Sequence, residues 1–147
     1  MDNINYKDYS SHFSEKNILE KEFKSLNFIN TLPEKNLNKS KLIVLNNYST
    51  FLYKCLAANS PTILFFKRDC WKVNDKALKL YDDLNKAGIL FYDPVLAAEK
   101  IKNVWPGVMQ WWNSDKVQFA RKNFCNEYAN KSNKWLLIWI KFLLNQS

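Results

Sequence analysis

A short polar segment at residues 46–50 carries the side chains best suited to bind a phosphate group. It follows an apolar run at residues 42–45 and leads into a predicted helix. Free N–H groups and the helix dipole make the start of a helix attractive to anions. Asn47, Ser49 and Thr50 add side-chain donors for phosphate oxygens. The alternative is that Ser49 or Thr50 only caps the helix.

Two cations could complete such an anion site. Lys54 lies one helical turn after the segment, and Arg68 follows a second apolar run at residues 62–66. Arg68 belongs to a polar loop that also contains Trp71. Either cation could pair with a phosphate. The plain alternatives are a solvated helix lysine and a solvated loop that Trp71 anchors to the protein.

Residue counts exclude several other kinds of site. The chain has 2 glycines, so neither GxGxxG nor GxxxxGK[ST] can be built. His12 is the only histidine, and Cys55, Cys70 and Cys125 have no zinc-ligand spacing. We therefore expect no metal and no cofactor.

The charged residues point to no catalytic group. Asp82, Asp83 and Glu99 fall on polar faces of predicted helices and form no pair suited to acid–base work, so the catalytic residues stay unassigned. The net charge of +8 comes mainly from dispersed lysines in a composition typical of an AT-rich genome. We therefore do not expect nucleic-acid binding.

The elements that must position the anion site alternate along the chain. Strands are predicted at residues 42–45, 62–66 and 89–92, and helices at 14–27, 50–59, 74–87, 94–104, 106–113, 114–130 and 132–144. This order predicts an α/β fold with a small parallel, Rossmann-like sheet of about three strands, crossover helices and a helical C-terminal tail. We expect an N-terminal segment at 1–40 and the α/β domain at 41–147.

Apolar positions predict which helix faces are buried. Ala77, Leu80, Tyr81, Leu84 and Ala87 form one helical stripe, which Gly88 ends. Helix starts are predicted at Asn74 and Asp93. Further buried positions are expected in the later helices: Val95, Ala98, Ile101, Trp105, Trp111, Trp112, Val117, Ala120, Phe124, Tyr128, Trp135 and Trp139.

The remaining composition favours a cytoplasmic protein. The cysteines have no disulfide pattern, and the first 30 residues lack the features of a secretory signal. The longest apolar run, residues 135–144, falls short of the roughly 20 residues that a membrane span needs. We expect no membrane span and interpret this run as a buried or interfacial helix.

One string resembles a family signature. Residues 49–62 read STFLYKCLAANSPT and continue into ILFF. They resemble a bacterial transferase family found with surface-polysaccharide genes, whose pattern is TTFLE-x-x-AANIPT before an apolar strand. The likeness continues through KAGI at 86–89, Ala97-Ala98, Val104-Trp105, Trp111-Trp112, VQFARKNFCNEYA at 117–129 and Trp135-Leu136. It covers residues 41–140, about two thirds of the chain.

The resemblance implies a nucleotide-sugar site. That family is similar to GT-B glycosyltransferases, whose C-terminal Rossmann-like domain binds the sugar donor. The loop matching residues 46–50 would hold the donor phosphates. Lys54 stands where the family has a glutamate that contacts the ribose, and a cation cannot accept hydrogen bonds from hydroxyl groups.

The chain is short for a complete GT-B glycosyltransferase, which has two domains. We find no acceptor domain and only part of a donor sheet, so the resemblance implies a donor-domain remnant or a split subunit. It would bind a nucleotide or nucleotide-sugar and need a partner chain for catalysis. The alternative is a non-catalytic interaction or assembly domain, which pairs or self-associates through an exposed sheet edge.

Overall fold

The computed structural model describes residues 15–25, 33–37, 39–70, 74–129 and 135–145. The chain divides into two compact units, Met1–Leu32 and Pro33–Ser147. The first unit contains α1 (Glu15–Glu22), which is shorter than the predicted helix at 14–27. The predicted domain boundary after residue 40 stays a prediction, and the segment 1–10 lies outside the described residues.

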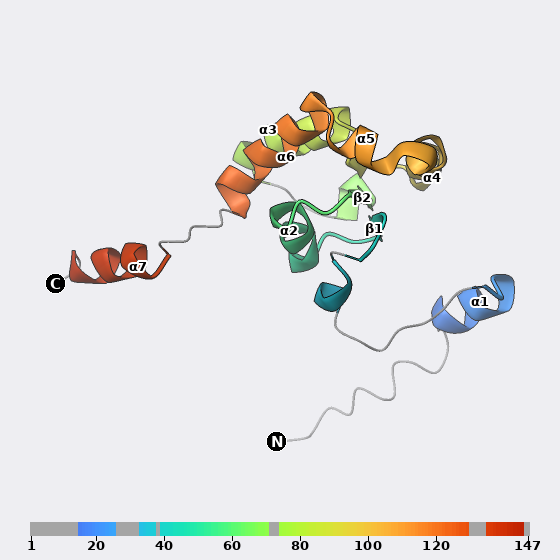
Figure 1. The fold of residues 1–147 in the computed structure, drawn as a ribbon, viewed down its shortest axis with the longest axis horizontal. Helices are drawn as coiled ribbons and strands as arrows, with labels where there is room; N and C mark the ends of the chain where they lie inside the picture. The colour runs from blue at the N-terminus through green and yellow to red at the C-terminus, as the bar shows by residue number, and fades with distance from the viewer. Residues whose placement is uncertain (1–14, 26–32, 38, 71–73, 130–134, 146–147) are drawn as a thin grey trace, which may run out of the picture. The chain divides into compact units, whose positions relative to one another are not determined.

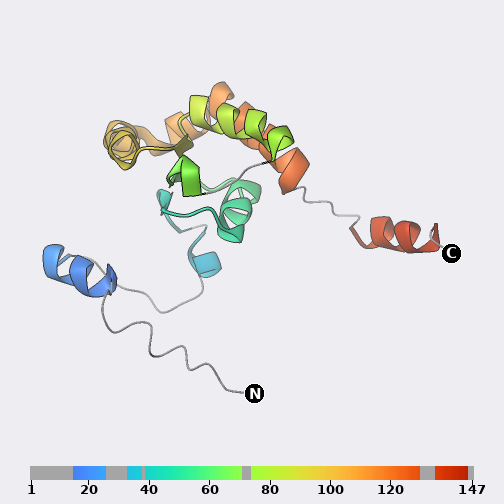
Figure 2. The same ribbon diagram turned by 180° about the vertical axis from the view of Figure 1, so that it is seen from behind.

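The second unit holds a parallel sheet of three strands in the order β1 (Ile43–Leu45), β2 (Thr62–Phe65) and β3 (Leu90–Phe91). The α/β fold class and the small parallel sheet are therefore confirmed. The central strand β2 is buried except at Phe65, whereas the side chains of β1 are half-buried or exposed. Figure 1 labels the helices α1 to α7, and Figure 2 shows the same ribbon from behind. The remaining elements are η2 (Pro33–Asn36), α2 (Thr50–Ala57), η3 (Arg68–Cys70), α3 (Asp75–Lys86), α4 (Pro94–Val104), η4 (Trp105–Gly107), α5 (Val108–Trp112), α6 (Asp115–Tyr128) and α7 (Trp135–Leu144).

Helices cover both faces of the sheet. Successive strand residues point to opposite faces. Leu64 therefore packs with the cluster formed by α2, α3 and α6, whereas Ile63 packs with α4 and α5. α3 and α6 lie side by side in both views (Figures 1 and 2). This arrangement leaves the carboxyl ends of the strands, rather than the faces of the sheet, to hold a site.

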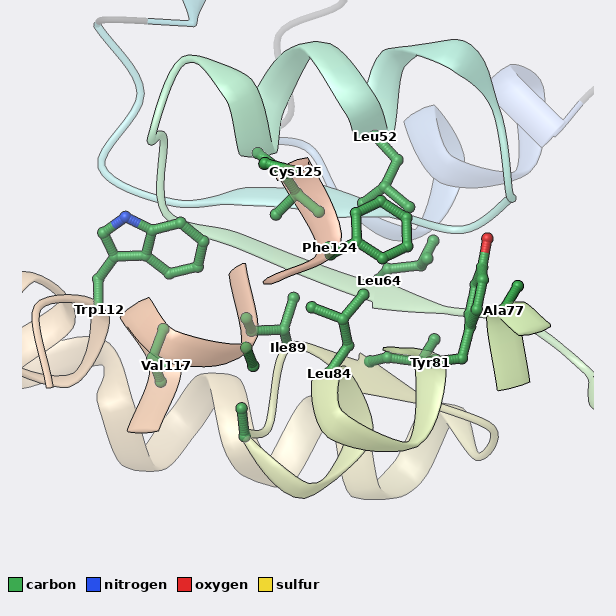
Figure 3. Packing of buried hydrophobic residues seen from close by; sticks show 14 of the residues in the cluster. Leu52, Leu64, Ala77, Tyr81, Leu84, Ile89, Trp112, Val117, Phe124 and Cys125 are labelled. Atoms are coloured by element: carbon green, nitrogen blue, oxygen red, sulfur yellow. The ribbon is translucent and has the colours of Figure 1, made fainter. Parts of the chain in front are cut away.

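The larger cluster is centred on Phe124 of α6, which is fully buried. Figure 3 shows its ring between Leu52 of α2 and Tyr81 of α3, above Leu64. The ring centroids of Phe124 and Tyr81 are 5.6 Å apart in an edge-to-face pair, which is a favoured aromatic geometry. Ala120 of α6 is also buried, as predicted, whereas Tyr128 near the end of α6 is 40% exposed, contrary to the prediction.

Local signals place the ends of the helices as predicted. Asn74 Oδ1 accepts a hydrogen bond from the N–H of Lys76 at 3.0 Å and begins α3. Asp93 Oδ1 accepts from the N–H of Val95 at 2.6 Å and begins α4. Gly88 follows α3 with φ of +75°, the left-handed conformation that glycine adopts at little cost.

The buried side of α4 differs from the prediction. Val95 is 63% exposed and Ala98 is also exposed, whereas Ala97 and Val104 are buried. Ala97, Ile101 and Val104 follow the i, i+4, i+7 spacing that stays on one helix face. The predicted set advanced by three residues at each step and drifted around the helix.

The prediction that the tryptophans pack in the core is right only in part. Trp112 is fully buried and Trp111 half-buried, but Trp105 and Trp139 are 51% and 57% exposed. Trp105 lies beyond the end of α4, where Lys41 Nζ stands 4.4 Å from its ring centroid. A cation over the ring stabilises an indole that is not enclosed. The side chains of Trp71 and Trp135 lie outside the described residues.

Candidate anion site at the carboxyl edge of the sheet

The carboxyl ends of the three strands bring the predicted site segments to one edge of the sheet. Residues 46–49 follow β1, residues 66–68 follow β2, and Tyr92 follows β3. Because the strands are parallel, these segments share an edge. In open α/β sheets, ligands bind beyond this edge.

The first segment ends where α2 begins. Ser49 is the N-cap residue, with an extended backbone (φ −139°, ψ 167°) and no side-chain capping hydrogen bond. The first turn of α2 has no acidic side chain, and Asn47 and Thr50 are exposed. The first N–H groups of a helix lack partners within the helix. The N–H of Leu52 already donates to the carbonyl of Ser49 at 3.0 Å, so the candidate backbone donors are the amides of Thr50 and Phe51. The Ser49 hydroxyl is not used as the cap.

Arg68 lies at the same edge, in η3. Its guanidinium carbon is 5.4 Å from the ring centroid of Tyr92, so the cation stands over that ring. Burial raises the pKa of the Tyr92 hydroxyl, while the charge of Arg68 acts in the opposite direction. Arg68 is exposed, and its contact with Tyr92 holds a positive charge beside the end of β3.

Aromatic side chains form the floor beneath these segments. The ring centroid of Tyr48 is 6.2 Å from that of Phe66 and 5.6 Å from that of Tyr81, and Phe66 lies 5.6 Å from Tyr92. Burial, followed by a hydrogen bond with Tyr48, raises the pKa of Tyr81. This set of ring contacts was not predicted from the sequence. Its signal was an aromatic residue following each of the three strands.

Lys54 forms an ion pair with Glu34. Its Nζ donates to Glu34 Oε1 at 2.6 Å, which ties α2 to η2. This hydrogen bond from Lys54 is the main cause of the lowered pKa of Glu34. Lys54 therefore points toward the upstream connector, in a pair that the sequence analysis did not predict. Both side chains are partly exposed, so solvent screens the pair.

The AANSP part of the signature string has a structural role at the end of α2. Asn59 follows the helix with φ of 55°, a left-handed conformation that asparagine tolerates. The indole nitrogen of Trp112 donates to Asn59 O and Oδ1, each at 3.0 Å, and Gln118 Nε2 donates to the same Oδ1 at 3.1 Å. Arg121 donates to the carbonyl of Leu56 at 2.9 Å. These bonds fix the end of α2 against α5 and α6.

A hollow lies away from the predicted residues. It is a groove of about 410 Å³ along α3 and α6. Its lining carries two acidic and two basic side chains, whose charges offset each other. The lining residues are Asp83, Lys86, Asp115, Lys116, Phe119 and Ala120.

The described residues add two negative findings. Within these ranges no group of three or more His, Cys, Asp or Glu side chains could hold a metal ion. None of the helices in these ranges is long and apolar enough to cross a bilayer.

The fold places the chain among α/β proteins with a parallel sheet. A family model described as LIC12162 family transferase matches residues 1–143, so the chain belongs to this transferase family. Comparison with curated proteins and with solved structures found no match. The predicted resemblance to a transferase family is thereby confirmed.

Proposed function

We propose that this chain is a GT-B-like donor-domain remnant or split subunit that binds a nucleotide or nucleotide-sugar at the carboxyl edge of its sheet. Membership of a transferase family supports the reaction class. The observation that carries the proposal is the junction of β1 and α2. There the exposed Asn46 and Asn47, a helix start without a side-chain cap and the half-buried Ser49 coincide.

Each predicted residue has a role in this proposal. The first amides of α2, with Asn47, Ser49 and Thr50, donate to one phosphate group. Arg68 neutralises charge from the neighbouring strand end, held by its contact with Tyr92. Lys54 contributes if a ligand phosphate replaces Glu34 as its partner.

Catalysis in this proposal needs a second domain, supplied by a partner chain, to present the acceptor. Surface-polysaccharide biosynthesis is the process that the sequence resemblance suggests. The chain's own part is to hold the donor's phosphates and orient the sugar.

Calorimetry with UDP-, GDP- and CMP-sugars tests the proposal. We expect one of these donors to bind, and Ser49→Ala and Arg68→Gln each to weaken binding about tenfold, as loss of a hydrogen bond to a charged group does. Lys122→Gln, which removes an exposed charge on α6, is the matched control for Arg68→Gln. Absence of binding to all three donors at millimolar concentration would overturn the proposal.

The edge of the sheet supports a second candidate, an assembly domain. The N–H of Ile43 donates to the carbonyl of Pro61 at 2.8 Å, so Ile43 and Leu45 direct their backbone groups toward β2. The backbone groups of Val44 point to the opposite side, and its side chain is 46% exposed. An edge strand of this kind is open to pairing with another chain.

Sedimentation velocity distinguishes this candidate. Self-association through β1 should be lost in Val44→Lys and kept in Val95→Lys, which makes the same change at an exposed valine of α4. A chain that is monomeric at all concentrations and purifies without a partner contradicts an assembly role.

A further inference from the structure

α7 exposes apolar side chains around most of its circumference. The exposed fractions run from 44% for Ile140 to 69% for Leu144. Lys141 is the only charged residue between Trp135 and Leu144, and Asn145 follows it one turn later on the same line. The apolar exposed residues are Leu136, Leu137, Ile138, Trp139, Ile140, Phe142, Leu143 and Leu144.

A single groove or a second helix covers one stripe of a helix and leaves the rest in water. A helix that is apolar on most sides is covered either by the core of a large protein or by lipid. A lipid surface can cover every side except a narrow polar line. At 1.5 Å per residue, the 10 residues of α7 extend about 15 Å, half of the roughly 30 Å hydrocarbon core. The helix would therefore lie along the interface.

Aromatic and basic residues favour the same surface. Trp139 and Phe142 form an edge-to-face pair with ring centroids 6.0 Å apart, and tryptophan is enriched at membrane interfaces. Lys141 lies within the helix, Lys131 and Lys134 precede it in the sequence, and the chain carries a net charge of +8. Basic residues beside a membrane helix attract anionic lipids.

We propose that α7 binds in the plane of a membrane surface that contains anionic phospholipids. Its apolar sides insert among the acyl chains near the headgroups, and Lys141 remains at headgroup level. This attachment does not depend on the proposed nucleotide site.

Flotation of the full chain with lipid vesicles tests the proposal. We expect at least about tenfold stronger binding to phosphatidylcholine vesicles that contain phosphatidylglycerol than to phosphatidylcholine alone, with weakening as salt is added. Leu143→Glu should reduce binding about tenfold or more, because it places a charge in the apolar face. Leu96→Glu makes the same change at an exposed leucine of α4 and should bind as the parent chain does.

A second measurement keeps the test decisive if Leu143→Glu fails to fold. Brominated lipids should quench tryptophan fluorescence in the parent chain. Trp139→Phe should remove part of this quenching, and Trp105→Phe, at another exposed tryptophan, should not. The proposal is overturned if the parent chain does not bind anionic vesicles, or if Leu96→Glu weakens binding as much as Leu143→Glu. A dimer lost in Leu143→Glu without vesicle binding overturns it as well and identifies a second copy as the partner.

Discussion

The indole nitrogen of Trp112 donates to both the backbone carbonyl and the side-chain oxygen of Asn59, each at 3.0 Å. Asn59→Gly keeps the left-handed backbone and loses the side-chain acceptor, so we expect it to lower the free energy of unfolding by about 1–2 kcal/mol. Asn113→Gly, at an exposed asparagine after α5, carries the same entropic cost of glycine and is the control. Urea denaturation measures both, and equal losses would show that the Asn59 side chain contributes nothing.

Gly88 is the position where a side chain should be tolerated least. An alanine there would have to adopt φ of +75°, and its Cβ would lie 2.9 Å from Lys100 Cε. We expect Gly88→Ala to destabilise the fold by about 1–2 kcal/mol, mainly through the backbone, because Lys100 can move. At Gly107 the nearest atom is Gln110 Oε1 at 3.3 Å and φ is −137°, so Gly107→Ala should change stability much less. Thermal unfolding compares the two variants. If Gly107→Ala lowers stability as much as Gly88→Ala does, the left-handed backbone at Gly88 is not the cause.

The buried thiols should be inert at neutral pH. Burial raises the pKa of Cys55 to about 11 and raises that of Cys125. In a Cys70→Ser chain, which leaves only these two thiols, Ellman's reagent should react slowly with the native protein and fast in urea. Rapid reaction without urea at pH 8 would contradict the burial.

The same shift gives a pH dependence of stability. A thiol whose folded-state pKa is raised stabilises the fold below its unfolded pKa, and this contribution is lost as pH rises toward the folded value. The contribution of Cys55 should therefore fade between about pH 8.5 and 11. Urea titrations across this range should show a shallower alkaline decline in Cys55→Ala than in the parent chain. If stability declines equally in Cys55→Ala and in the parent chain, Cys55 does not contribute to the pH dependence.

The pair between Lys54 and Glu34 should influence ligand binding. Glu34→Gln removes the carboxylate that holds Lys54, so nucleotide affinity should increase if Lys54 can reach a phosphate. Glu127→Gln, at an exposed glutamate of α6, changes the net charge equally and should have a smaller effect. Calorimetry compares the two, and equal affinities would remove Lys54 from the proposed site.

The carboxyl group of Glu34 reports the pair directly. Lys54→Met should raise the pKa of Glu34 toward its usual value of 4.5, as measured by NMR titration. Because the folded-state pKa is lowered, the pair stabilises the fold above that value and the contribution fades as pH falls. An unchanged pKa in Lys54→Met would show that the hydrogen bond does not form in solution.

Features that depend on neighbouring residues could be predicted from the sequence. The three strands are short apolar runs between polar segments, and their order along the chain implies the parallel sheet. Asn74 and Asp93 begin helices through local hydrogen bonds, Gly88 follows the end of α3 in a left-handed conformation, and all three were placed correctly. Such signals lie within a few residues of the element that they bound.

Features that join distant parts of the chain could not be predicted in this way. Trp112 contacts Asn59 across 53 residues, and Lys54 pairs with Glu34 across 20, so no local spacing reveals either partner. Trp139 follows the periodicity of a buried helix, yet it is exposed because periodicity does not say which surface a helix contacts. The residues of the candidate anion site follow from strand order and stay a prediction. An aromatic residue after each strand was visible in the sequence, but only the folded chain shows that these rings contact one another.

An NMR titration of the ¹⁵N-labelled chain with UDP tests the central claim most directly. If the carboxyl edge holds the donor phosphates, the largest amide shifts should fall at Asn47, Ser49, Thr50 and Arg68, and they should saturate together. No shifts at millimolar UDP, or shifts confined to the groove along α3 and α6 beside Lys116, would contradict it.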